Sequence, residues 1–260
     1  MPADVPPGDP AMTDPVTSVP SSVPGASGDV FEAPRVPRVP VVGGGLFPVH
    51  RIYCVGRNYA EHAAEMGADA RESPFFFGKP ADAVVPVAEG RTGEIDYPTL
   101  TQDFHHEVEL VVAIGAPAAL LTGPVTNDRA AELVFGYAIG LDMTRRDLQA
   151  ASKKAGRPWS IAKGFDQSAP IGPIHPLAAT GELRAGEIAL DVNGTRRQTG
   201  DLASMIWNVR ETIAWLSGAW RLQPGDLIFT GTPAGVGAVQ RGDRMTARIA
   251  GLGTLEVVVV

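Results

Sequence analysis

Apolar segments with the composition of β-strands recur along this chain, and several are bounded by turn pairs such as Gly-Asp and Asn-Gly. A first, short buried strand is predicted at 51–56, where it ends at a glycine. Further strands are predicted at 108–114, 134–141, 188–192, 227–229, 245–249 and 254–260. Helices are fewer, the best at about 144–155 and about 206–216. Because the strands outnumber the helices and do not alternate with them, we expect a β-rich α+β fold and no doubly wound sheet.

The first forty residues differ from the rest of the chain. Ten prolines lie between Met1 and Pro40, and the apolar residues there follow neither a helical nor an alternating period. We therefore predict a disordered, proline-rich segment at 1–45 and one folded domain at 46–260. The segment lacks the basic start and apolar core of a signal peptide, and its acidic residues argue against an organellar transit sequence.

Composition limits the possible partners and compartment. The formal net charge of −7 repels nucleic acid, and nothing approaches the roughly 18 consecutive apolar residues that span a bilayer. A single cysteine, Cys54, excludes an internal disulfide framework and agrees with a reducing compartment. We expect a cytoplasmic protein that binds neither membrane nor nucleic acid. Small anions remain possible ligands of local basic clusters such as Arg145-Arg146, although solvated helix faces explain such clusters more often.

Two glutamates stand at the head of the predicted strand 108–114. Side chains alternate along a strand, so Glu107 and Glu109 point the same way, on a face that continues into Val111 and Ala113. Two carboxylates that enter an apolar layer repel each other and need a proton or a positive partner, for example a hard divalent cation. The alternative is that both lie on a wet strand end before burial begins.

A third carboxylate, Asp142, directly follows the predicted strand 134–141. Site residues often collect at such strand ends. Three oxygen ligands without a cysteine or a histidine pair favour Mg²⁺, Mn²⁺ or Ca²⁺ over zinc. An aspartate in this position can equally cap the next helix, and the spacing alone leaves that alternative open.

Two further motifs have chemical potential. His62 and Glu65 are three residues apart on a predicted helix, so they share one face and could act as a general base; a solvated surface pair is the plainer interpretation. The stretch "TGTPAGVG" follows a strand near the C-terminus, and its glycines either form turns or let backbone N–H groups and Thr232 approach an anion. The sequence contains no G-x-S-x-G, H-E-x-x-H or C-x-x-C motif.

Taken together, these segments resemble the fumarylacetoacetate hydrolase superfamily from about Phe47 to the C-terminus. The matching pieces, all in the family's order, include "VGRNYAEHAAEMG", "FFFGKPADAVV", "HHEVELVVAIG", "GYAIGLDMTRRDLQ", "RPWSIAKGFDQSAPIGP", "LDVNGTRRQTGDLASMIW" and "PGDLIFTGTPAGVG". The resemblance implies a mixed, barrel-like β-roll with few peripheral helices, commonly in a homodimer.

The resemblance also assigns roles to residues. It implies that Glu107, Glu109 and Asp142 bind Mg²⁺ or Mn²⁺, and that Lys163 lies near the metal. His62 and Glu65 match a pair that activates water on a mobile segment that closes over the substrate. The positions expected to contact the substrate, a small anionic 2-oxo acid, are Arg146, Gln149 and Thr232.

Within the superfamily, the chain is most similar to the branch that hydrolyses fumarylpyruvate to fumarate and pyruvate in aromatic degradation by the gentisate route. The resemblance therefore implies metal-dependent hydrolysis of a carbon–carbon bond in an acylpyruvate. Oxaloacetate decarboxylation or general acylpyruvate hydrolysis is the nearest alternative, and isomerase or hydratase chemistry is a further one. A catalytically inactive ligand-binding or interaction protein is the alternative from another functional class.

Overall fold

A computed structural model describes residues 31–59, 72–115 and 123–260 of the chain. Contacts divide the chain into two units, Met1–Arg35 and Val36–Val260, and all the elements given below belong to the second unit. No helix in the described ranges is long and apolar enough to cross a membrane.

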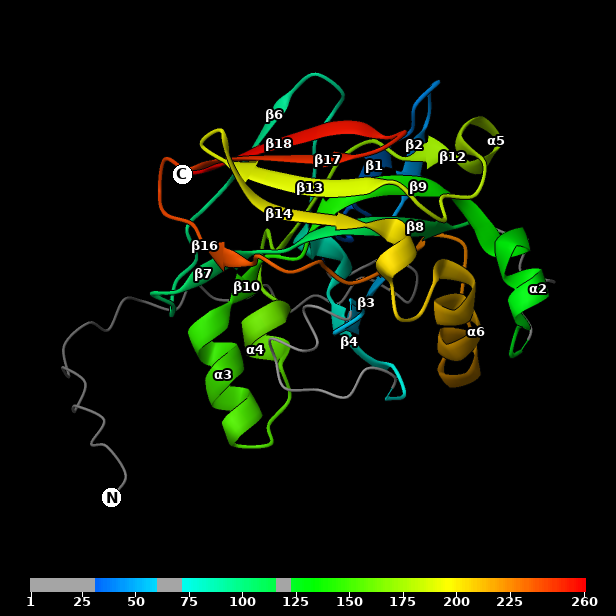
Figure 1. Cartoon of the computed structure of the whole chain (residues 1–260), viewed down its shortest axis with the longest axis horizontal. Coiled ribbons are helices and arrows are strands. Elements are labelled where there is room, and N and C mark those ends of the chain that lie inside the picture. The colour runs from blue at the N-terminus through cyan, green and yellow to red at the C-terminus, as the bar shows by residue number, and fades with distance from the viewer. Residues whose placement is uncertain (1–30, 60–71, 116–122) are drawn as a thin grey trace, which may run out of the picture. The chain divides into compact units, whose positions relative to one another are not determined.

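Two large sheets dominate the second unit (Figure 1). Within the described residues, the larger sheet has eight strands: β4 (Phe75–Lys79), β3 (Arg51–Gly56), β15 (Asp226–Phe229), β8 (Val108–Ile114), β9 (Val134–Leu141), β11 (Ala169–Ile171) and β5 (Val84–Pro86) in this order, with β12 (His175–Pro176) also on β9. The other has five, in the order β14 (Thr195–Asp201), β13 (Glu187–Val192), β17 (Arg244–Ile249), β18 (Gly253–Val259) and β6 (Thr92–Ile95). Parallel and antiparallel pairs occur in both, so both sheets are mixed.

Small elements complete the unit. A three-stranded sheet joins β10 (Thr144–Arg145), β7 (Phe104–His106) and β16 (Gly237–Ala238), and β1 (Arg38–Pro40) pairs with β2 (Leu46–Pro48). The described helices are α2 (Asn127–Ala130), α3 (Arg146–Lys154), α4 (Ser160–Lys163), α5 (Leu177–Thr180) and α6 (Val209–Ala219), with 3-10 turns η1 (Ala81–Ala83), η3 (Ala131–Leu133) and η4 (Leu202–Ser204). The expected β-rich α+β fold with a curled, roll-like sheet and few peripheral helices is confirmed.

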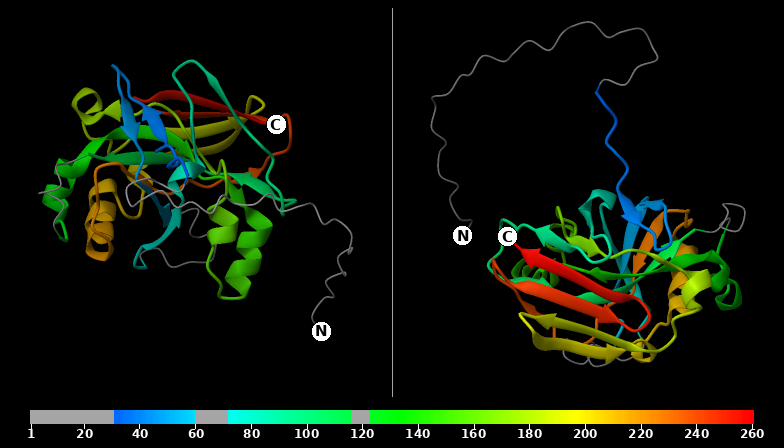
Figure 2. Two further views of the ribbon diagram at one scale, coloured as in Figure 1. Left: turned by 180° about the vertical axis from the view of Figure 1, so that it is seen from behind. Right: turned by 90° about the horizontal axis from the view of Figure 1, so that it is seen from above.

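The alternation of side chains on β8 divides the core into two layers. Leu110 and Val112 belong to a large apolar cluster that includes the inward side chains of the five-stranded sheet, which lies across the eight-stranded one (Figure 2). Val111 and Ala113 point to the opposite face and pack in a second cluster with Phe229 and other residues of β3, β11 and β15. The face that continues from Glu107 and Glu109 is therefore buried, as the alternation predicts.

The predicted strands are confirmed to within a residue at each end. Order in the described chain begins earlier than the boundary predicted at residue 46, because β1 lies within the segment 1–45 and its Val39 side chain is fully buried. The prediction of disorder for the remainder of this segment falls mostly on residues 1–30, which lie outside the described residues.

Both predicted helices are present but start later. Thr144 and Arg145 pair with β7 in an antiparallel ladder, so that α3 begins only at Arg146. The N-cap of α3 is Arg145 without a side-chain cap, so the alternative role of Asp142 as a helix cap is wrong. Helix α6 begins at Val209 because Asn208 and Glu211 form a reciprocal capping box.

Candidate metal centre and active site

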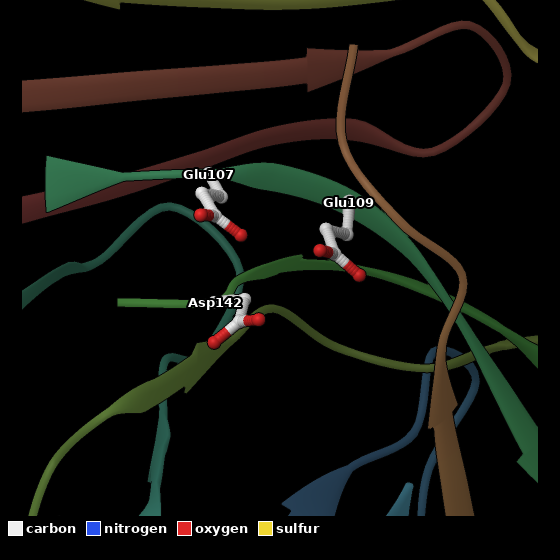
Figure 3. A group of neighbouring side chains, drawn as sticks. All are labelled: Glu107, Glu109 and Asp142. Atoms are coloured by element: carbon white, nitrogen blue, oxygen red, sulfur yellow. The ribbon is translucent and has the colours of Figure 1, made fainter. Parts of the chain in front are cut away.

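The three predicted metal ligands converge at the point where β8 begins and β9 ends (Figure 3). In this antiparallel pair Glu109 lies opposite Gly140, and the backbone N–H of Asp142 donates to the carbonyl of Glu107 at 2.9 Å. One carboxylate oxygen from each of Glu107, Glu109 and Asp142 lies within 4.8 Å of the other two. The three residues are at most 5 % exposed, so the alternative of a wet strand end is wrong.

Buried cations surround two of the three carboxylates. The Lys163 ammonium donates to Glu107 Oε2 at 2.8 Å, to Asp142 Oδ2 at 2.7 Å and to Thr144 Oγ1 at 2.6 Å. Lys79 Nζ lies 2.8 Å from Asp142 Oδ1, although its hydrogen bonds go to backbone carbonyls. Burial lowers the pKa of Lys163, but the negative charges of Asp142 and Glu107 outweigh this effect and raise the pKa above its ordinary value. Lys163 is therefore a charged, fixed ammonium beside the carboxylates.

Glu109 is the least compensated of the three. Its Oε2 accepts a 2.7 Å hydrogen bond from the backbone N–H of Gly231, whose φ of +95° and close approach to Asn58 require glycine. Burial, followed by the charges of Asp142 and Glu107, raises the pKa of Glu109 well above its usual range. Its ionised form therefore needs another positive charge nearby.

The donor set fits a hard divalent cation. It consists of three carboxylates, which are the ligands that Mg²⁺ and Mn²⁺ prefer. Asp142 Oδ1 accepts no hydrogen bond although it is buried, and Glu109 needs added positive charge. Glu107, Glu109 and Asp142 are thus suited to hold such an ion together, with other coordination positions left for a ligand.

The triad and most of the other predicted site residues line one pocket. The lining residues are Val55, Gly56, Arg57, Phe77, Glu107, Glu109, Asp142, Arg146, Gln149, Trp159, Lys163 and Thr232. The structure therefore brings together seven of the nine residues that the sequence singled out. The other two, His62 and Glu65, lie outside the described residues.

Helix α3 contributes Arg146 and Gln149 to this wall. The Arg146 guanidinium donates to Glu107 Oε1 and to Gln149 Oε1, each at 2.5 Å, and to His105 Nδ1 at 3.3 Å. Gln149 is 3 % exposed and lies one turn after Arg146. Arg146 thus ties the helix to the start of β8 and fixes the Gln149 amide against the pocket.

Thr232 follows Gly231, the donor to Glu109, and is oriented by a buried glutamine. Gln198 Oε1 accepts from the backbone N–H of Val108, and Gln198 Nε2 donates to the carbonyl of Pro233, which fixes the amide in one orientation. His106 Nδ1, 2.9 Å from Gln198 Oε1, must then carry a hydrogen. Burial is the main reason that the pKa of His106 falls to about 4, so this histidine is neutral.

This orientation determines what Thr232 can do. The second N–H of the Gln198 amide donates to Thr232 Oγ1 at 2.7 Å, so the threonine oxygen already acts as an acceptor. No acceptor for the Thr232 hydroxyl hydrogen is found in 31–59, 72–115 or 123–260. The hydroxyl is therefore available to donate to an oxygen in the pocket that its side chain lines.

Sequence reasoning did not single out three site residues. Arg57 directly follows β3, and this position at a strand end was a signal that could have identified it. Lys79 is the last residue of β4, so its strand-end position was a similar signal, whereas Gln198 lies inside β14, where the sequence pattern gives no sign that its side chain turns toward the site. Only the tertiary contacts reveal Gln198.

Known proteins with related sequences and structures share this arrangement of elements. The family model for the C-terminal part of fumarylacetoacetate (FAA) hydrolase matches residues 51–260. A fumarylpyruvate hydrolase of Ralstonia is 44 % identical over 188 residues, which cover 72 % of this chain and 93 % of that protein. An oxaloacetate tautomerase of Escherichia coli is 40 % identical over 206 residues, covering 79 % of this chain and 90 % of its own.

A solved structure is also similar. The crystal structure of fumarylpyruvate hydrolase from Pseudomonas aeruginosa, in complex with Mn²⁺ and pyruvate, superposes with a TM-score of 0.86 at 53 % identity. The match covers 90 % of this chain and 99 % of that one.

Proposed function

Because the chain belongs to the fumarylacetoacetate hydrolase family, we propose that it is a divalent-metal-dependent hydrolase that cleaves fumarylpyruvate to fumarate and pyruvate. The observation that carries the proposal is the convergence of three buried carboxylates in a pocket that also holds Lys163, Arg146 and Thr232. The similar Pseudomonas enzyme, which binds Mn²⁺ and pyruvate, supports both the metal class and the 2-oxo acid.

Glu107, Glu109 and Asp142 would hold the Mg²⁺ or Mn²⁺. When bound, such an ion supplies Lewis-acid stabilisation for negative charge on the oxygen of a 2-oxo acid. The protein's own contribution is to keep Glu107 and Asp142 ionised and to hold all three carboxylates in place. Lys163 does this for Glu107 and Asp142, and Arg146 holds the other oxygen of Glu107.

The remaining polar residues of the pocket would bind and orient the substrate. Thr232 would donate its free hydroxyl hydrogen to a pyruvyl oxygen, and Gln149 would contact the substrate from α3. The Lys163 ammonium would stabilise the enolate that develops as the bond breaks. These groups are fixed by buried hydrogen bonds before the substrate arrives, so little reorganisation is needed.

Hydrolysis requires a water molecule and a base. We assign the base to His62 and Glu65, on the basis of their spacing of three residues and the family resemblance. The water oxygen adds to the carbonyl carbon on the fumaryl side, and the carbon–carbon bond to the pyruvyl methylene breaks. The electron pair of that bond remains with the pyruvyl group as an enolate, which takes up a proton to give pyruvate.

A second candidate is interconversion of the enol and keto forms of oxaloacetate. The identity to the Escherichia coli tautomerase favours it, and the chemistry needs the same stabilisation of an enolate without the attack by water. Hydrolysis ranks first because the fumarylpyruvate hydrolases are more similar to this chain in both sequence and structure.

Product analysis with the two substrates tests the proposal. We expect the Mn²⁺-loaded protein to release equal amounts of pyruvate and fumarate from fumarylpyruvate, and a chelator to abolish the release. Oxaloacetate is supplied in parallel, with pyruvate formation and decay of the enol absorbance followed separately. Rapid loss of the enol form together with a failure to cleave fumarylpyruvate would replace hydrolysis by tautomerisation.

A further inference from the structure

Arg57 is held in a strained conformation at the edge of the pocket. Its φ of +55° lies in the left-handed region, which is strained for a non-glycine residue. Its two neighbours impose this geometry. A Cβ on Gly56 would lie 2.0 Å from the Phe75 ring, and the Asn58 side chain, fully buried, bonds to the backbone of Trp207 and Thr230. The surrounding structure thus fixes the backbone of Arg57 and the direction in which its side chain leaves the backbone.

The Arg57 guanidinium lacks the partner that the other buried cations have. It lies over the Phe75 ring, 5.6 Å from the centroid, and its Nε is buried without a hydrogen bond. Across 31–59, 72–115 and 123–260, no carboxylate pairs with it. Lys79, Lys163 and Arg146 already pair with two of the three carboxylates, Glu107 and Asp142. Arg57 is therefore a cation in excess, in a pocket that would gain more positive charge from a divalent ion.

A second positive charge lies near the first. Lys153 is seven residues after Arg146 on α3, so it shares that helix face. Partial burial, followed by the charges of Arg57 and Arg146, lowers the pKa of Lys153. Lys153 itself is exposed to solvent, at the end of this face away from the triad.

We propose that Arg57 forms a subsite for the second carboxylate of the substrate, the one at the end of the acyl group. This inference rests on the proposed function. The ion held by the carboxylate triad and the Thr232 hydroxyl would bind the pyruvyl end of the substrate. The distal carboxylate of a fumaryl group needs a partner of its own. The planar guanidinium, which lies over the Phe75 ring, matches a carboxylate with two parallel hydrogen bonds.

The subsite predicts a preference for dicarboxylic substrates. We compare fumarylpyruvate with acetylpyruvate, which has the same pyruvyl end but no distal carboxylate. In the Arg57→Gln variant, the ratio of kcat/KM for fumarylpyruvate to that for acetylpyruvate should fall about 10- to 100-fold, the usual effect of one charge-assisted hydrogen bond. Arg57→Lys should lose less, and Arg91→Gln, at an exposed arginine outside the pocket, is the matched control. An unchanged ratio overturns the proposal.

Product binding gives a readout that does not depend on turnover. The Mn²⁺-loaded protein is titrated calorimetrically with fumarate and, separately, with pyruvate. Arg57→Gln should weaken fumarate binding about tenfold or more and pyruvate binding much less. Equal weakening of both would mean that Arg57 holds the 2-oxo acid carboxylate, and the subsite would be rejected. If the wild type fails to cleave fumarylpyruvate while fumarate binding still depends on Arg57, the proposed function fails and the subsite stands.

Discussion

Glu107 and Asp191 are each held between two cations, yet they lie in different surroundings. One oxygen of Glu107 contacts Arg146 and the other contacts Lys163. Asp191, on β13 of the five-stranded sheet, likewise gives one oxygen to Arg196 and the other to Arg248. The contact distances, 2.5 to 2.8 Å in the first group and 2.5 to 2.6 Å in the second, hardly distinguish them.

Exposure of the cations does distinguish them. The Lys163 and Arg146 side chains are 2 % and 16 % exposed, whereas those of Arg196 and Arg248 are 44 % and 43 % exposed. Water screens the outer pairs, so each contributes little to stability. In the inner group, water is largely excluded, and Glu109 and Asp142 add further negative charge. A carboxylate held between two cations therefore indicates a functional site only under two conditions. It must be buried, and neighbouring negative charges must make its group depend on an additional positive ion.

The largest effect is expected when the inner group loses a metal ligand. Glu109→Gln should remove Mn²⁺ binding and lower kcat/KM roughly 10³-fold or more, because the stabilisation of the enolate by the ion is worth several kcal/mol. Mn²⁺ should raise the Tm of the wild type, since it binds only the folded protein, and should leave that of the variant unchanged. Asp191→Asn is the control and should keep the full response to Mn²⁺. If the Glu109→Gln variant still binds Mn²⁺, Glu109 is not a ligand of the ion.

Loss of an inner cation should cost stability. Lys163→Met leaves Glu107 and Asp142 buried without their shared ammonium, which should lower the free energy of unfolding by about 3–5 kcal/mol in the absence of metal. Part of this loss should return on addition of Mn²⁺. The matched change on the outer sheet, Arg248→Met, should cost less than about 1 kcal/mol. Urea unfolding measures both variants. Equal losses of unfolding free energy would show that burial does not make the inner ion pairs stronger than the outer ones.

The neutral hydrogen bonds of the site allow a finer comparison. A glutamate at position 198 cannot donate to Thr232, so the Thr232 hydroxyl should turn from the pocket toward the new carboxylate. Gln198→Glu and Thr232→Val should therefore each raise KM for fumarylpyruvate about tenfold, the value of one hydrogen bond. The double variant should be no worse than either single one, and Thr232→Ser should behave like the wild type. Additive effects of the two substitutions on KM would show that Gln198 does not act through Thr232.

The smallest effect concerns the outer carboxylate. Burial raises the pKa of Asp191, but its hydrogen bonds to Arg196 and Arg248 outweigh this, so the pKa lies below the ordinary 3.8. Its contribution is therefore present above about pH 4 and lost as the pH falls through the lower folded value. Asp191→Asn should cost less than about 1 kcal/mol at pH 7, and this cost should shrink as the pH falls below about 4 and in high salt. Thermal melting at these pH values measures it.

The sequence predicted the strands and the convergence of three carboxylates well because both depend on local rules. Strand alternation placed Glu107 and Glu109 on one face, and the end of the next strand placed Asp142. The start of α3 was predicted too early, because pairing of Thr144 with β7 competes with helix formation and tertiary contacts decide the outcome.

Residues that act through distant contacts could not be predicted in this way. Gln198 reaches Thr232 from 34 positions earlier in the chain, and Lys79 lies 63 positions from Asp142. The φ of Arg57 arises from the packing of Gly56 against Phe75, which no propensity of the arginine itself reveals. Long-range packing thus determines the supporting residues, while local periodicity places the three carboxylates.

The ladder between β8 and β9 also limits how the protein can misfold. If β8 slipped by one residue against β9, its side chains would exchange faces, and Glu109 would enter the apolar layer beneath the five-stranded sheet. A carboxylate there would have no cation to neutralise it. The acidic residues that create the site therefore also penalise the wrong alignment of the strands that carry them.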